Sequence, residues 1–218
     1  MLRPQKQFTY RNMQTLFRRL KLFIFVVPLV LLVPIGGTKQ TKHNKRIKIV
    51  ALGDSITKGN YNSWVEITKK ETGIEFINRG INGDTLRGMD FRLVNHVINT
   101  HPDICIIMGG TNDVFEPRND TKKMMNHLEN MVMDLRFSKI KVVIGLPLPL
   151  AAYPKREVVL QSLRESIKQR FYFIDFYSDF KGREKELLAD GIHPNRKGSR
   201  VMADRMKAEL QKIINENI

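Results

Sequence analysis

The sequence predicts an α/β fold, a three-layer α/β/α sandwich built around a parallel five-stranded sheet. Short runs rich in Ile, Val and Phe alternate with longer amphipathic segments throughout residues 47–218. The short runs lack the polar alternation of a half-solvated sheet, as is typical of parallel strands covered on both faces. Strands that alternate with helical segments in this way favour helices on both sides of the sheet.

The strands are expected, in chain order, at 47–52, 74–78, 104–108, 140–145 and 171–175. The third run is purely hydrophobic and holds Cys105. As the only cysteine, it has no partner for an internal disulfide and is expected to be a small buried side chain. Amphipathic helices are expected at 63–71, 85–100, 121–137 and 156–169. A last helix, at 197–215, has an apolar stripe made of Val201, Met202, Met206, Leu210, Ile213 and Ile214.

The N-terminal part of the chain accounts for most of its positive charge. Residues 1–46 contain ten Lys or Arg residues and no Asp or Glu, whereas the whole chain of 218 residues has a formal charge of +15. The remainder carries a net charge of only +5 and no dense basic stripe, so nucleic acid is not an expected partner. A chain of this length is expected to form one domain with a substantial core.

The first 38 residues predict a signal peptide or an N-terminal membrane anchor. A basic stretch precedes an apolar run at 22–35, which has 14 residues and two prolines. That run is short for a membrane span of about 20 residues and is typical of a secretory signal, although no Ala-x-Ala cleavage site follows it. An uncleaved anchor, with its positive charge on the cytoplasmic side, is the alternative. Residues 39–46 then form a basic tether, and either alternative places the domain at 47–218 outside the cytoplasm.

A serine follows the first strand in the sequence Gly-Asp-Ser-Ile, at 53–56. Taken alone, Ser55 is either a nucleophile at the end of the strand or a helix cap. The string Ser-x-x-Lys at 55–58 also occurs in penicillin-binding enzymes, but their companion motifs are absent. The Gly-x-Ser-x-Gly elbow of α/β-hydrolases does not fit either, because Thr57 occupies the position of the second glycine.

Two glycine-containing loops follow the second and third strands. Taken alone, the loop at 78–85 is best interpreted as a plain turn; its functional interpretation is that the backbone N–H of Gly83 is free to approach a ligand. The loop Gly-Gly-Thr-Asn-Asp at 109–113 is either a turn with a local Asn cap or a means of aiming the Asn112 amide into a cleft. Both loops are expected at the same edge as Ser55, because ligands bind beyond the carboxyl ends of parallel strands.

The loop Asp-Gly-Ile-His-Pro-Asn at 190–195 precedes the last helix and holds the most informative histidine. Taken alone, this block is either a plain loop or a base with its orienting acid. In the second interpretation the carboxylate of Asp190, three residues before His193, accepts from the imidazole Nδ1–H and leaves Nε2 facing outward as a base. The other four histidines lie in the tether, within helices or at a helix end. A metal site is not expected, because no third ligand stands at a characteristic spacing from this pair.

Together, the residues and order of these four blocks resemble the SGNH (GDSL-type) hydrolase family across nearly the whole of residues 47–218. The resemblance implies a flavodoxin-like sandwich, in agreement with the order of elements above. It implies that Ser55 is the nucleophile, that His193 is the base and that Asp190 orients this base. It also implies an oxyanion hole made of donors from Ser55, Gly83 and Asn112. An isoleucine replaces the leucine of the family's name, which is a chemically minor departure.

The expected function is that of an exported serine esterase that hydrolyses lipid or short-chain acyl esters and needs no cofactor. A carbohydrate O-acetylesterase acting on envelope or extracellular glycans is the alternative among enzymes. A membrane-tethered binding protein without turnover is the alternative of another class, which the intact set of site residues disfavours. The apolar loop at 146–154 either lines an acyl pocket or packs against a neighbouring helix. Without a long insertion to form a lid, the site is expected to be shallow and open.

Overall fold

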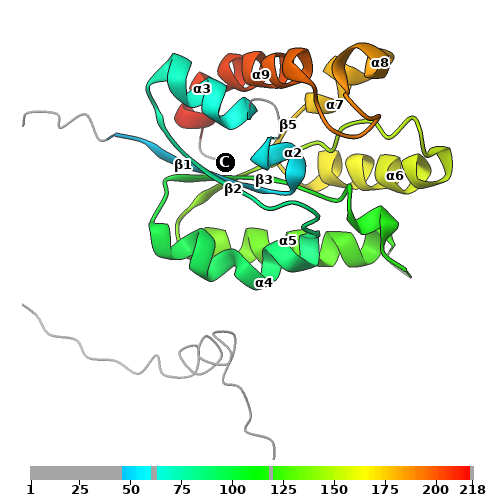
Figure 1. The fold of residues 1–218 in the computed structure, drawn as a ribbon. Coiled ribbons are helices and arrows are strands. Elements are labelled where there is room, and N and C mark those ends of the chain that lie inside the picture. The colour runs from blue at the N-terminus through cyan, green and yellow to red at the C-terminus, as the bar shows by residue number, and fades with distance from the viewer. Residues whose placement is uncertain (1–45, 60–62, 118–119, 217–218) are drawn as a thin grey trace, which may run out of the picture. The chain divides into compact units, whose positions relative to one another are not determined.

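A parallel sheet of five strands, in the order β2-β1-β3-β4-β5, forms the centre of the domain (Figure 1). The computed structural model describes residues 46–59, 63–117 and 120–216. All four neighbouring pairs are parallel, so the carboxyl ends of the strands share one edge. The strands are β1 (Lys48–Gly53), β2 (Glu75–Gly80), β3 (Ile104–Met108), β4 (Lys141–Gly145) and β5 (Phe173–Ile174).

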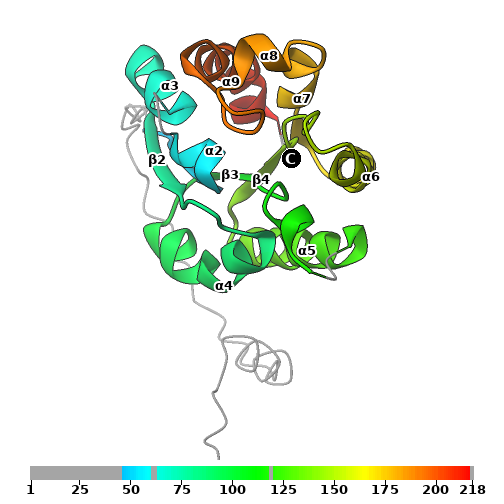
Figure 2. The same ribbon diagram turned by 45° about the vertical axis from the view of Figure 1, so that its right-hand side comes forward.

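Helices cover both faces of this sheet, as Figures 1 and 2 show from two directions. One face is covered by α4 (Leu86–His96), α5 (Thr121–Phe137) and α6 (Pro154–Arg170). The other is covered mainly by α3 (Trp64–Thr72) and α9 (Arg196–Asn215). The short elements are α2 (Ser55–Lys58), α7 (Phe176–Phe180), α8 (Glu184–Leu187) and the 3₁₀ turns η1 (Ile98–Thr100) and η2 (Asp113–Phe115). The predicted three-layer fold is confirmed.

Each strand supplies side chains to two separate hydrophobic cores. Val50 and Leu52 of β1 pack with α4, α5 and α6, whereas Ile49 and Ala51 pack with α3 and α9. All four are fully buried. This follows from the two-residue period of a strand, and burying a Val, Leu or Ile side chain contributes about 1.5–3 kcal/mol. The absence of polar alternation in the sequence thus reflects a sheet buried on both faces.

The structure differs from the sequence prediction at two elements. The strand predicted at 171–175 is confirmed only at Phe173–Ile174, because the Asp175 side chain accepts from the Ser178 N–H and begins α7. The helix predicted at 85–100 is broken into α4 and η1. His101, at φ 50°, ends η1 before Pro102, which disfavours helical backbone in the residue before it. The prediction lacks α2, α7, α8 and η2, because elements this short leave no clear periodicity.

The segment predicted as a signal peptide or anchor, at 1–38, lies outside the described residues. So does nearly all of the tether predicted at 39–46. Both therefore stay predictions. Within the part of the chain that the structure describes, no helix combines the length and the apolar character that a membrane span requires.

Candidate active site

Ser55 lies in a tight turn, at residues 53–56, that joins β1 to α2 (the serine turn). At Gly53 a Cβ atom would lie 2.7 Å from the carbonyl oxygen of Met108 on the neighbouring strand, so a side chain does not fit there. Asp54 caps α2 by accepting from the Ile56 N–H at 2.9 Å. Ser55 is therefore the first residue of α2, where backbone N–H groups have no partner within the helix.

The Ser55 hydroxyl contacts His193, which lies 138 residues further along the chain. Ser55 Oγ and His193 Nε2 are 2.8 Å apart, and His193 Nδ1 lies 2.7 Å from Asp190 Oδ2. A carboxylate only accepts hydrogen bonds, so Nδ1 carries the proton and Nε2 is left to accept from the serine hydroxyl. Hydroxyl, imidazole and carboxylate thus form one continuous hydrogen-bonded chain.

Asp190 also fixes the loop that carries His193. Its Oδ1 accepts from the N–H groups of Ile192 and His193, at 3.0 and 2.8 Å. Partial burial acts to raise the pKa of Asp190, but these backbone hydrogen bonds and the one from the imidazole outweigh it and hold the pKa below its ordinary value. The carboxylate is therefore charged at neutral pH, where it can stabilise a positively charged imidazole.

Gly83 lies in an exposed turn next to the serine turn. A hydrogen bond of 3.2 Å from the Asp84 N–H to the Ile81 carbonyl closes this turn, and another of 3.0 Å from the Ile81 N–H to the Gly53 carbonyl joins it to β1. Gly83 has a φ of 73°, which favours glycine. A Cβ at this position would meet nothing within 4 Å, so the backbone is open to a ligand.

Asn112 is tied to the same turn. Its Nδ2 donates to the Asp84 carbonyl at 2.9 Å, a contact that the sequence did not indicate. An amide nitrogen carries two hydrogens, so one remains for a ligand. The carboxylate of the next residue, Asp113, accepts from the Leu86 N–H at the start of α4, at 3.0 and 3.2 Å. The loops of Gly83 and Asn112 are therefore held together.

Asp54 is a buried acid that the sequence interpretation missed. Its side chain is almost fully buried beside Ser55, and burial raises its pKa from 3.8 to about 7. The hydrogen bond from Ile56 and the nearby His193 act in the opposite direction, but less strongly. The signal in the sequence was its position as a capping acid directly before the serine.

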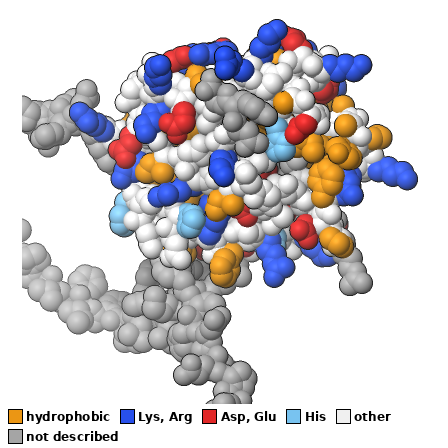
Figure 3. Space-filling model, viewed as in Figure 1, with side chains coloured by type: hydrophobic (Ala, Val, Ile, Leu, Met, Phe, Trp, Pro, Cys, Tyr) orange, Lys and Arg blue, Asp and Glu red, His pale blue; other side chains and the backbone are white. Residues whose placement is uncertain are grey.

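Three partly exposed apolar side chains, here called the apolar rim, lie on the segments that follow β2, β3 and β4: Ile81, Phe115 and Tyr153. The exposed fractions of these residues are 42%, 36% and 40%. The rings of Phe115 and Tyr153 meet edge to face with centroids 5.2 Å apart. Figure 3 shows hydrophobic side chains gathered beside a histidine and an acidic side chain on one face of the domain.

The apolar loop at 146–154 has two parts. Its leucines are buried in the two cores, whereas residues 151–153 are exposed. A Cβ at Gly191 would lie 3.3 Å from that of Ala152, so the exposed tip lies beside the loop of Asp190 and His193. The buried part packs as a core segment, and only the tip is available to a substrate.

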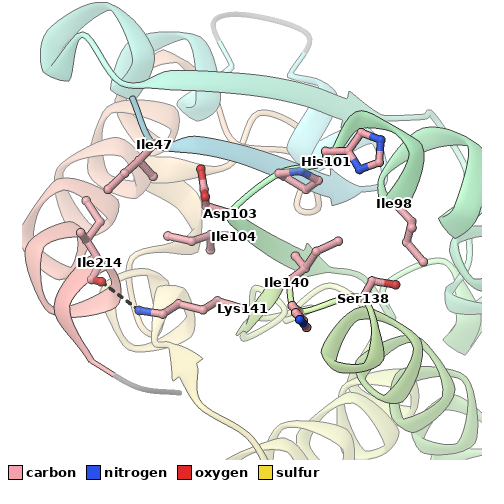
Figure 4. Close-up of a pocket in the computed structure, with 11 residues that line it drawn as sticks. Ile47, Ile98, His101, Asp103, Ile104, Ser138, Ile140, Lys141 and Ile214 are labelled. Atoms are coloured by element: carbon pink, nitrogen blue, oxygen red, sulfur yellow. Dashed lines mark hydrogen bonds between the residues drawn. The ribbon is translucent and has the colours of Figure 1, made fainter. Parts of the chain in front are cut away.

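Two hollows are lined by residues from the loops of the candidate site. A polar hollow of about 510 Å³ is lined by Thr85, Arg87, Asp113, Glu116, Asn126 and His127, among others. A mainly apolar hollow of about 440 Å³ is lined by Ala151, Ala152, Leu188 and Gly191, with Glu184 and Lys185. A third, of about 470 Å³, opens at the amino end of the sheet, where Ile47, His101 and Lys141 line it, and it contains none of the predicted site residues (Figure 4). Within the described ranges, no cluster of three or more His, Cys, Asp or Glu residues forms a metal site.

Comparison with known proteins places the chain among hydrolases. The sequence profile of the GDSL-like lipase/acylhydrolase family matches residues 51–201. A lipolytic G-D-S-L protein from Veillonella parvula is 27% identical with a TM-score of 0.68, covering 76% of this chain and 99% of its own. A GDSL-like lipase from Bacteroides thetaiotaomicron is 28% identical with a TM-score of 0.67, covering 77% of this chain and 89% of its own. An acetyl-xylooligosaccharide esterase from Geobacillus shares the fold. It is 20% identical with a TM-score of 0.64, covering 79% of this chain and 96% of its own. No curated protein sequence matches the chain.

Proposed function

The chain belongs to the GDSL-like lipase/acylhydrolase family, and on that premise we propose that it is an exported serine esterase using Ser55, His193 and Asp190. Membership confirms the resemblance to SGNH hydrolases and makes the protein a serine hydrolase that acts on esters. The observation that carries the proposed mechanism is the hydrogen-bonded chain from Ser55 Oγ through His193 to Asp190, with distances of 2.8 and 2.7 Å.

A free serine hydroxyl is a weak nucleophile at neutral pH and needs an adjacent base. His193 Nε2 takes the proton as Ser55 Oγ attacks the carbonyl carbon of the ester, and then returns it to the departing alcohol. Water hydrolyses the resulting acyl-enzyme by the same path. The N–H groups of Ser55 and Gly83 and the free hydrogen of the Asn112 amide receive the negative charge on the carbonyl oxygen. Each such donor is typically worth about 10²–10³ in rate.

Lipid or short-chain acyl esters are the proposed substrates. The apolar rim of Ile81, Phe115 and Tyr153 supports an acyl group, because these side chains are partly exposed on loops at the carboxyl end of the sheet. The apolar hollow beside Gly191 offers further contact area next to the histidine loop. Neither feature requires a lid, which fits a shallow site.

A carbohydrate O-acetylesterase is the second candidate. The polar hollow at Thr85, Arg87 and Asn126 supports it, because sugar hydroxyls need hydrogen-bonding partners. An acetyl ester would also leave most of the apolar rim unused. The likeness to the acetyl-xylooligosaccharide esterase does not favour this candidate, since at 20% identity it extends to the fold alone.

Export rests on the sequence of the N-terminal segment. Its basic start, apolar run and small following residues support translocation of the domain, by a cleaved signal or an uncleaved anchor. Fractionation of cells that produce the full chain tests this. The domain should be found outside the cytoplasm, and deletion of residues 1–38 should retain it inside. An unchanged location after the deletion would contradict export by this segment.

Hydrolysis of p-nitrophenyl acetate, butyrate and octanoate by the full chain tests the enzyme and its substrate class together. The change Ser55→Ala should abolish turnover, whereas the control Ser166→Ala, in a partly exposed serine of α6, should leave it unchanged. A preference for butyrate or octanoate supports acyl esters, and strict preference for acetate supports the glycan esterase. Folded wild-type protein that hydrolyses none of the three, and releases no acetate from acetylated xylan, would favour the binding protein.

A further inference from the structure

Arg92 is a buried arginine on α4 whose guanidinium reaches the edge of the sheet where Ser55 lies. The residue is only 8% exposed. Its Nε donates to Asp84 Oδ2 at 2.7 Å, and its Nη2 donates to the carbonyl oxygens of Gly53 and Arg79 at 3.0 and 2.8 Å. Its Nη1 lies 3.3 Å from His96 Nδ1. Burial, and then the charge of Arg92, lower the pKa of His96, so this imidazole is neutral and accepts.

These partners belong to the segments whose positions relative to one another matter for the proposed chemistry. The Gly53 carbonyl opens the serine turn, and the Arg79 carbonyl lies at the end of β2, just before the turn of Gly83. Asp84 is the residue after Gly83, and its own carbonyl accepts from Asn112 Nδ2 at 2.9 Å. One guanidinium therefore contacts the serine turn directly. Through Asp84 it is also linked to the two proposed oxyanion donors outside that turn, the Gly83 N–H and the Asn112 amide.

We infer that Arg92 is a positioning residue that fixes the Gly83 and Asn112 donors relative to Ser55. The inference rests on the proposed function. Arg92 touches no reacting atom, and it acts by clamping Asp84 against the Gly53 carbonyl. Arginine suits this task because its planar fork can bind a carboxylate and two carbonyls at once, whereas lysine offers a single flexible ammonium.

The clamp should affect the transition state more than the bound ester. The oxyanion needs donors at 2.7–3.1 Å, and a displacement of about 1 Å can cost about 10²-fold in rate. The ground-state ester, held by its acyl and alcohol groups, is much less sensitive to the same shift. Loss of Arg92 should therefore lower kcat and leave KM nearly unchanged.

The test compares Arg92→Met and Arg92→Lys with a matched control, Arg164→Met, in the full chain. Arg164 is also buried, pairs with Glu157, and donates to the carbonyls of Pro147 and Leu148 at 3.3 Å. Its partners are of the same kinds as those of Arg92, but none of them belongs to the segments around Gly83. Thermal unfolding of all three variants reports the structural cost of losing a buried arginine.

Activity on p-nitrophenyl butyrate should separate the variants. For Arg92→Met, kcat should fall about 30–100-fold with KM within about threefold, and Arg92→Lys should lie between this and wild type. A trifluoromethyl ketone, which adds Ser55 Oγ to form a tetrahedral oxyanion, should bind Arg92→Met more weakly by a similar factor. Binding of butyrate, the product, should barely change. Arg164→Met should lower the unfolding temperature while keeping kcat within about threefold.

A double-mutant cycle with Asn112→Ala shows whether Arg92 acts through the oxyanion donors. The combined loss in kcat should be smaller than the product of the two single losses, because a clamp on Asn112 has less effect once the Asn112 amide is gone. A combined loss equal to the product would overturn the inference, as would a kcat within threefold of wild type in both Arg92 variants. If Arg92→Met does not fold, the same criteria apply to Arg92→Lys. Inactive wild-type protein would instead reject the proposed function, and this inference with it.

Discussion

Replacing Asp54 by Asn should remove a loss of stability that the wild-type protein undergoes as the pH rises from about 4 to about 7. The Asp54 carboxyl is fully buried beside Ser55, and burial raises its pKa from 3.8 to about 7. The folded protein therefore holds this proton more tightly than the unfolded chain does. The stabilising contribution is complete below pH 3.8 and is lost as the pH rises through the folded pKa. Asparagine stays neutral and can still accept from the Ile56 N–H.

The size of this effect follows from the two pKa values of Asp54. Their separation corresponds to about 4 kcal/mol of unfolding free energy over the full range, at about 1.4 kcal/mol for each pH unit. About 2–3 kcal/mol of that change lies between pH 5 and pH 8, because the folded carboxyl is already mostly protonated at the lower value. An effect of this size is a large part of the stability of a typical domain.

Urea unfolding of wild-type protein, Asp54→Asn and Asp120→Asn at pH 5 and pH 8 measures this difference. Asp120 is the matched control, because it also caps a helix but is exposed. The free energy of unfolding of Asp54→Asn, relative to wild type, should rise by about 2–3 kcal/mol from pH 5 to pH 8, and that of Asp120→Asn should rise by less than about 0.5 kcal/mol. A difference in unfolding free energy between Asp54→Asn and wild type that does not change with pH would show that burial does not keep the Asp54 carboxyl neutral.

Three further changes test the site. Asn112→Ala should lower kcat about 10²–10³-fold by removing one oxyanion donor, with little effect on thermal unfolding, and an unchanged kcat would exclude that role. Asp190→Asn should be less active than Asp190→Ala, because an amide donor facing Nδ1 forces the proton of His193 onto Nε2, where it blocks the serine; steady-state assays giving the reverse order would contradict this. His193→Ala should lower kcat at least 10³-fold while the protein stays folded by circular dichroism, and near-wild-type turnover would exclude His193 as the base.

The framework of the fold could be predicted because its signals are local. The strand at Ile104–Met108 and the helix at Thr121–Phe137 have the predicted bounds, since a run of buried residues or a helical stripe is visible without knowledge of its neighbours. The strand at Phe173–Ile174 was overpredicted, because its length depends on how far β4 extends beside it and on the cap at Asp175.

The candidate site could be predicted as far as the topology of the sheet brings its loops together. Ser55, Gly83 and Asn112 follow three neighbouring strands of a parallel sheet, so their loops must meet at one edge. The contacts between those loops were not predictable. Arg92 reads in the sequence as one charge beside an apolar stripe, and its acceptors at Gly53 and Arg79 are fixed only by tertiary packing. The pKa of Asp54 likewise depends on burial by elements distant in the sequence.

The proposed function depends most on Ser55 being a nucleophile that His193 activates. The most direct measurement is to treat the full chain with a fluorophosphonate, digest it and locate the phosphonyl adduct by mass spectrometry. We expect one adduct, on Ser55, formed with loss of fluoride; it should be absent from Ser55→Ala and should form much more slowly in His193→Ala. An adduct on another serine, or ester hydrolysis that persists in Ser55→Ala, would contradict this role of Ser55.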